Sequence, residues 1–162
     1  MIQRTEGPKG PSQCRNLGAE IASGQFLVFL DSDDLIDSRC LLQRVDEATQ
    51  RPDFDLWVFP VELFRECPGD VKLPWNHMSQ DSETLSRFLR SDGPWCVSSP
   101  LWRKSAFQSV GGFNPAVMYG DDAELHIRAL LLGLRFLQYP MAAVDVFIRR
   151  SDAARITNSC DT

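Results

Sequence analysis

Four consecutive residues carry the chemistry that is easiest to recognise in this chain. Asp31, Ser32, Asp33 and Asp34 follow an unbroken apolar run, residues 26–30, which has the length of a strand buried on both faces. In a parallel sheet, ligands bind beyond the carboxyl ends of the strands. Carboxylates gathered there repel each other unless a cation compensates their charge. A hard divalent ion such as Mg²⁺ or Mn²⁺, which can also hold a diphosphate, fits this pattern.

The acidic run also has a purely structural interpretation. Asp33 or Asp34 could cap the helix that follows, while the other carboxylates are solvated. A calcium-binding EF-hand is excluded, because Ile36 and Leu42 stand where that loop needs glycine and glutamate.

A phosphatase of the haloacid dehalogenase type is a further alternative for the same segment. Its nucleophilic aspartate also follows an apolar strand, and Asp31 and Asp33 match the first two acidic positions of its motif. Leu35 stands in the fifth position of that motif, where the phosphatases have threonine. Asp121 and Asp122 could imitate their distal acidic motif.

The elements that must position these carboxylates follow from hydrophobic periodicity. The expected helices cover residues 12–23, 38–50, 82–89, 104–110 and 121–132, and the expected strands cover residues 25–30, 55–64, 95–102, 134–139 and 142–149. Ser12 is expected to cap the first helix. In the helix over residues 38–50, the buried face is expected to carry Leu41, Leu42 and Val45. In the strand over residues 55–64, Pro60 marks an edge or a bulge. This order predicts a three-layer α/β/α fold with a mostly parallel central sheet.

Composition limits the classes of protein that remain. The chain has 162 residues, 43% of them hydrophobic, and its formal net charge is −5, which argues against nonspecific binding to nucleic acid. Its apolar runs are far shorter than the roughly 20 residues of a membrane-spanning helix. The 5 cysteines show no CxxC pair, so we expect reduced thiols and a cytoplasmic location.

Further motifs follow in a fixed order along the chain. Before the acidic run they are a glycine turn at Gly10, the pair Arg15–Asn16 and the sequence Ala22–Gly24. After it they are the segment Arg103–Phe113, which ends in Gly-Gly-Phe, and the segment Asp121–Arg128. In this order the motifs resemble those of family 2 of the nucleotide-sugar glycosyltransferases, which have the GT-A fold. The resemblance extends over nearly the whole chain, so it is more specific than any single motif.

The resemblance implies a role for each matching residue. Asp31 and Asp33 resemble the aspartate pair that holds the donor, with Asp31 directed to the ribose or the metal and Asp33 bound to Mg²⁺ or Mn²⁺. Arg15 matches an arginine near the donor nucleotide, and a structural salt bridge is its alternative. Asp122 matches the general base, which must take the proton of an acceptor hydroxyl because a sugar hydroxyl is a poor nucleophile. The reaction implied is sugar transfer with inversion at the anomeric carbon.

One position departs from the family pattern. Relatives usually have Glu-Asp where this chain has Asp121 and Asp122, so either of these carboxylates could face the acceptor and both are candidate catalytic residues. A structural alternative is that both stabilise the positive N-terminus of a helix.

Other residues have weaker claims to a functional role. His126 is expected to be incidental, and Trp95 and Trp102 are expected in the core although they could line an acceptor groove. Residues 111–112 are both glycine and predict a tight turn at positive φ. Residues 149–150 are both arginine, and they could pair with a diphosphate or form a solvated surface pair.

The partners implied by the resemblance are a nucleotide-sugar donor and a saccharide or other hydroxyl acceptor, without nucleic acid or a membrane span. Family relatives begin with an apolar strand, a P-x-Y-N-like turn and a D-D-G-S segment, and none of these precedes Gly10. We therefore expect residues 1–162 to form a single glycosyltransferase-like domain, truncated by its first βα units. A noncatalytic remnant that binds nucleotide sugar is a third interpretation, beside the glycosyltransferase and the phosphatase.

Overall fold

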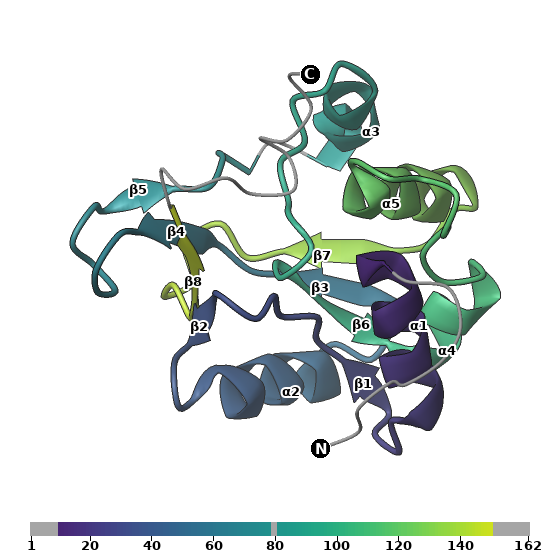
Figure 1. The fold of residues 1–162 in the computed structure, drawn as a ribbon. Coiled ribbons are helices and arrows are strands. Elements are labelled where there is room, and N and C mark those ends of the chain that lie inside the picture. The colour runs from purple at the N-terminus through teal and green to yellow at the C-terminus, as the bar shows by residue number, and fades with distance from the viewer. Residues whose placement is uncertain (1–9, 79–80, 151–162) are drawn as a thin grey trace, which may run out of the picture.

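The computed structural model describes residues 10–78 and 81–150, and these form an α/β fold (Figure 1). The helices are α1 (Pro11–Ile21), α2 (Cys40–Gln50), α3 (Asp81–Leu89), α4 (Lys104–Ser109) and α5 (Asp121–Leu131). The strands are β1 (Phe26–Leu27), β2 (Leu35–Ile36), β3 (Leu56–Val58), β4 (Val61–Phe64), β5 (Leu73–Pro74), β6 (Pro100–Arg103), β7 (Phe136–Gln138) and β8 (Val146–Arg149).

The central sheet has the strand order β1-β6-β3-β7. Strands β1, β3 and β7 run in one direction, and β6 lies reversed between β1 and β3. Three of the four strands thus run in one direction, in agreement with the predicted mostly parallel sheet, although β3 and β7 are the pair among them that is hydrogen-bonded in parallel. The reversed direction of β6 could not be predicted, because a hydrophobic run indicates a strand but not its direction in the sheet.

Helices cover both faces of this sheet, as expected. Successive strand residues point to opposite faces, and β3 shows this clearly: Leu56 and Val58 share one core with Leu125 of α5. Trp57, between them in sequence, packs in another core with Ala48 of α2. The first core also includes residues of α1, α3 and α4, so these helices and α5 form one layer and α2 forms the other.

A second four-stranded sheet continues from the first, with the order β2-β8-β4-β5. The expected strand over residues 55–64 is divided into β3 and β4, which belong to different sheets. The division falls at Phe59 and Pro60, because proline has no N–H to donate to a sheet ladder. Pro60 thus ends one sheet and lets the chain begin the other.

The predicted core face of α2 is wrong. The residues expected on it are exposed: Leu41, Leu42 and Val45. Leu41 and Leu42 are 53% and 64% exposed, whereas the buried face consists of Cys40, Arg44 and Ala48. An arginine takes the central buried position because the fold supplies partners for every part of its guanidinium.

Those partners come from distant segments. Arg44 Nε and Nη2 donate to the two carboxylate oxygens of Asp145 at 2.7 and 2.5 Å. Arg44 Nη1 donates to the carbonyl oxygens of Ser98 and Ser99 at 2.9 and 3.1 Å. The guanidinium carbon also lies 4.8 Å from the ring centroid of Phe59. This fully buried ion pair joins α2 to the segments before β6 and β8.

The aromatic core also contains His126, on α5. Its ring lies against Phe88, Trp95 and Trp102, with centroid separations of 5.3, 5.5 and 6.0 Å. Burial lowers the pKa of His126 to about 3, so the imidazole is uncharged at neutral pH. Trp95 and Trp102 are thus core residues, as the sequence predicts, and His126 is a buried core residue with them.

Within the described ranges, no helix is both long and apolar enough to cross a membrane. The described cysteines are free thiols: Cys14, Cys40, Cys67 and Cys96. Burial raises the pKa of Cys40 and of Cys96 to about 11, which keeps both thiols protonated. Cys160 lies outside the described residues, and the cytoplasmic location stays a prediction.

The substitution Asp145→Asn should destabilise the fold by about 3–5 kcal/mol, because it leaves the buried charge of Arg44 without its counter-charge. Urea denaturation at neutral pH measures the loss. Asp46→Asn is the matched control, since Asp46 is exposed on α2 and the same charge is removed; it should change stability by less than about 0.5 kcal/mol. Equal effects of the two variants would contradict a structural role for the buried pair.

Candidate active site

Arg15 connects two of the other predicted site residues. It lies on α1, and its Nη2 donates to Asp31 Oδ1 at 2.6 Å, just beyond β1. Its Nη1 donates to Asp121 Oδ2 at 2.9 Å, at the start of α5. Burial opposes the charge of Arg15, but the hydrogen bond to Asp31 and the charges of Asp31, Asp121 and Asp122 raise its pKa above the ordinary value. The guanidinium of Arg15 therefore joins a residue predicted to bind the donor to the helix predicted to carry the general base.

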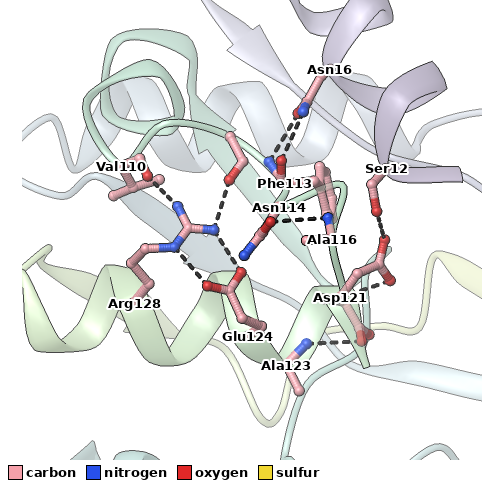
Figure 2. A network of polar contacts seen from close by, with 12 residues as sticks. Ser12, Asn16, Val110, Phe113, Asn114, Ala116, Asp121, Ala123, Glu124 and Arg128 are labelled. Atoms are coloured by element: carbon pink, nitrogen blue, oxygen red, sulfur yellow. Dashed lines mark hydrogen bonds and ion pairs between the residues drawn. The ribbon is translucent and has the colours of Figure 1, made fainter. Parts of the chain in front are cut away.

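Asp121 receives a second donor from α1 (Figure 2). Ser12 Oγ donates to Asp121 Oδ2 at 2.6 Å. The prediction that Ser12 caps α1 is wrong: Gly10 is the N-cap residue, no side chain caps the helix, and Pro11 opens it. Proline is favoured at this position because the first helical N–H groups have no partner within the helix. Ser12 is then available to bind α5.

The neighbour of Arg15 fixes α1 to the segment before α5. Asn16 Nδ2 donates to the carbonyl oxygen of Phe113 at 2.8 Å, and the N–H of Phe113 donates to Asn16 Oδ1 at 2.9 Å (Figure 2). Gly111 and Gly112 have φ of +83° and +68°, as the predicted glycine turn requires. A Cβ at Gly112 would lie 2.6 Å from Asn16 Oδ1, so only glycine allows this close approach.

The same turn is held from the other side by α5. Arg128 Nε and Nη2 donate to the carboxylate oxygens of Glu124 at 2.9 and 2.7 Å. Arg128 also donates to the carbonyl oxygens of Val110 and Gly112, the latter at 2.8 Å (Figure 2). The carbonyl groups of Val110 and Gly112 thus accept hydrogen bonds from a charged guanidinium. Helix α5 is therefore fixed at Asp121, where it begins, and again at Arg128.

Asp122 differs from Asp121 in its surroundings. It is half-buried and borders a cavity of about 940 Å³, which lies against α3 and α5. Burial raises the pKa of Asp122, and the charge of Asp121 adds to this, while the N–H of Ala123 and the charge of Arg15 oppose it. A carboxylate with a raised pKa is a stronger base than an ordinary aspartate, provided that it is ionised.

The carboxylates of the acidic turn after β1 differ in burial and in their contacts. Asp33 is exposed, whereas Asp34 is buried and accepts a hydrogen bond from the backbone N–H of Arg149 at 3.0 Å. The capping alternative for Asp34 is wrong, since Arg39 is the N-cap residue of α2 and no side chain caps that helix. Asp34 therefore attaches the turn to β8.

Arg149 also contacts this turn directly. Its Nε donates to the carbonyl oxygen of Asp33 at 3.3 Å, and its Nη1 donates to the carbonyl oxygen of Arg65 at 2.9 Å. The guanidinium carbon lies 4.5 Å from the ring centroid of Phe64. Arg149 is thus a packed, half-buried residue of the acidic turn. The alternative of a solvated surface pair does not describe it.

The acidic turn offers a cation few protein ligands. Among the described residues, no group of three or more His, Cys, Asp and Glu side chains is placed to hold a metal ion. Asp31 and Asp33 supply hard carboxylate oxygens, and Mg²⁺ is commonly held by one or two carboxylates together with waters and substrate phosphates. The donor set fits Mg²⁺ or Mn²⁺ that is completed by a diphosphate. It does not fit a cation enclosed by protein alone.

Sequence patterns did not reveal the lining of the cavity. Trp75 and Tyr119 border the same cavity as Asp122, yet neither belongs to a motif. Trp75 lies in the loop over residues 66–80, which the sequence suggests as a place for acceptor selection, but loop residues cannot be placed next to a helix from sequence alone.

Solved structures share this fold. S. aureus TarS 1-349 in complex with UDP-GlcNAc matches with a TM-score of 0.68 and 15% identity, over 93% of this chain and 42% of that chain. S. aureus TarS without a stated ligand matches with a TM-score of 0.66 and 16% identity, over 88% of this chain and 25% of that chain. These similarities show the GT-A fold that the sequence predicts.

The sequence itself places the chain in a family. The pattern of Glycosyl transferase family 2 matches residues 1–107, so the chain belongs to this family of glycosyltransferases. A curated relative is the poly(ribitol-phosphate) beta-glucosyltransferase of Bacillus spizizenii, which is 33% identical over 82 residues. That match covers 45% of this chain and 13% of the relative, so the chain spans a small part of that protein's length.

The substitution Asn16→Ala should destabilise the fold by about 1–3 kcal/mol, because it removes both partners of the Phe113 backbone groups. Thermal or urea unfolding measures this change. Asn114→Ala is the control: Asn114 is exposed and its Oδ1 accepts one hydrogen bond, from the N–H of Ala116 at 3.0 Å. A loss no larger than that of the control would show that Asn16 does not hold α1 in place.

Proposed function

We propose that this domain transfers a sugar from a nucleoside diphosphate donor to an acceptor hydroxyl, with inversion at the anomeric carbon. One observation carries the proposal above all: Asp122, a half-buried carboxylate with a raised pKa, borders a cavity and adjoins the cluster of Arg15, Asp31 and Asp121. Family membership supports sugar transfer and replaces the phosphatase interpretation. The activity and substrates of the whole protein are part of this proposal.

The donor side consists of Arg15, Asp31 and Asp33. Asp33, which is exposed on the turn after β1, would hold Mg²⁺ or Mn²⁺, and Asp31 would contact the donor ribose or the same cation. When bound, such a cation offsets the negative charge that develops on the leaving diphosphate. Because a TarS structure holds UDP-GlcNAc, UDP-sugars are the donor class to test first.

Asp122 is the proposed general base, and Asp121 is a positioning residue. Asp121 is bound through Oδ2 to both Ser12 and Arg15, so that oxygen is occupied by structural partners. Asp122 borders the cavity, where an acceptor can approach. It takes the proton of the acceptor hydroxyl while the oxygen forms its bond to the anomeric carbon. The bond from that carbon to the diphosphate breaks on the opposite face, and this displacement inverts the configuration.

The substitution Asp122→Asn should lower the transfer rate by about 10²- to 10⁴-fold, the usual contribution of a general base. Transfer and donor hydrolysis are measured with a panel of UDP-sugars and Mn²⁺, and Asp46→Asn is the control for the loss of one exposed carboxylate. Asp33→Ala should weaken Mn²⁺-dependent donor binding in calorimetry. Unchanged activity in both variants would rule out the proposed site, and a wild-type chain that binds donor without turnover would support the noncatalytic remnant.

The rate should also fall as the pH is lowered, because protonated Asp122 cannot accept a proton. An ordinary aspartate has a pKa of about 3.9, and burial raises that of Asp122. The acid limb of the pH–rate profile should therefore lie above pH 4. An acid limb at or below this value would show that a different carboxylate acts as the base.

A further inference from the structure

Two exposed aromatic side chains line the cavity that Asp122 borders. Trp75 is 41% exposed and Tyr119 is 45% exposed. Tyr119 immediately precedes Gly120, the N-cap residue of α5, so it lies within three residues of Asp122. Trp75 reaches the same cavity from the loop that follows β5. Both aromatic surfaces are thus open to a ligand beside the proposed base.

The loop that carries Trp75 is fixed in place. The backbone N–H of Trp75 donates to the carbonyl oxygen of Val61 at 2.8 Å. Asn76 Nδ2 donates to Asp92 Oδ1 and to the carbonyl oxygen of Gly93, both at 2.9 Å. The backbone that carries Trp75 is therefore fixed beside the cavity.

The charges around the cavity restrict the ligand. The charged residues among its described lining are Asp122, Glu124 and Arg128. Arg128 already forms two hydrogen bonds with Glu124, so its charge is compensated within the protein. The formal charges of these three residues add up to −1. Because Glu124 and Arg128 compensate each other, the remaining negative charge is that of Asp122. Such a lining disfavours a polyanion and suits an uncharged ligand, because like charges repel.

We propose that Trp75 and Tyr119 bind the acceptor, and that the acceptor presents an uncharged sugar or polyol unit to this cavity. The apolar C–H face of such a unit lies on the rings, and one of its hydroxyl groups reaches Asp122. Cavities of this kind combine aromatic walls with a few polar groups that fix orientation. The acceptor class thus differs from the polyanion in the name of the Bacillus spizizenii relative. The inference rests on the proposed function for the reaction, while the binding it describes is measured without a donor.

Calorimetric titration of the full chain compares uncharged polyols and oligosaccharides, among them ribitol and cello-oligosaccharides, with poly(ribitol phosphate). We expect a neutral ligand to bind, and we expect Trp75→Ala and Tyr119→Ala each to weaken this binding about 10-fold. Trp75→Phe, which keeps an aromatic ring, should restore most of the affinity. Leu42→Ala is the control, since Leu42 is exposed on α2 and does not line the cavity; it should bind as the wild type does.

The results separate this inference from the proposed function. Tighter binding of poly(ribitol phosphate) than of every neutral ligand would overturn the inference, and so would unchanged affinity in both alanine variants. If the wild type turns over, the alanine variants should raise KM for the acceptor more than they raise KM for the donor. Absence of donor binding and of donor hydrolysis would contradict the proposed function alone, because acceptor binding is measured independently.

Discussion

The site depends on one guanidinium that satisfies two carboxylates from different parts of the fold. Arg15 holds Asp31, in the acidic turn after β1, and Asp121, at the start of α5, at 2.6 and 2.9 Å. Without a cation between them these acidic segments would repel each other. Because the side chains of Arg15 and Asp121 are largely buried, their attraction is screened less than that of a surface pair. The acidic turn and the acidic helix can therefore lie side by side before any ligand binds.

The remaining contacts divide the carboxylates into those that hold the structure and those that are available for chemistry. Asp34 binds the backbone of β8, and Asp121 binds Ser12 and Arg15. Asp122 borders the cavity instead, and burial there raises its pKa. Asp122 also accepts a hydrogen bond from the N–H of Ala123 at 2.8 Å in the first turn of α5, so it contributes to the helix N-terminus as well. Its burial beside the cavity is what supports the proposed role of a base.

The order of the motifs predicted part of the contacts at the candidate site, while the roles of its residues stay predictions. Arg15, Asp31 and Asp121 were all predicted to belong to it, and the structure brings them into contact. Predictions failed where a contact depends on a distant partner. Arg44 is buried on α2 only because Asp145, 101 residues away, accepts its charge, and the apolar spacing of that helix gave no sign of this. Trp75 itself was not singled out within the loop over residues 66–80, because the place of a loop residue beside α5 cannot be derived from sequence.

A double-mutant cycle on Arg15 and Asp121 tests most directly whether this ion pair holds the site together. The unfolding free energies of Arg15→Met, Asp121→Asn and the double variant are compared with that of the wild type by urea denaturation at neutral pH. Residues in direct contact show coupling energies of about 0.5–3 kcal/mol, and we expect a favourable coupling of at least about 1 kcal/mol here. Additive effects, within about 0.3–0.5 kcal/mol, would contradict the account, because the two residues would then act independently.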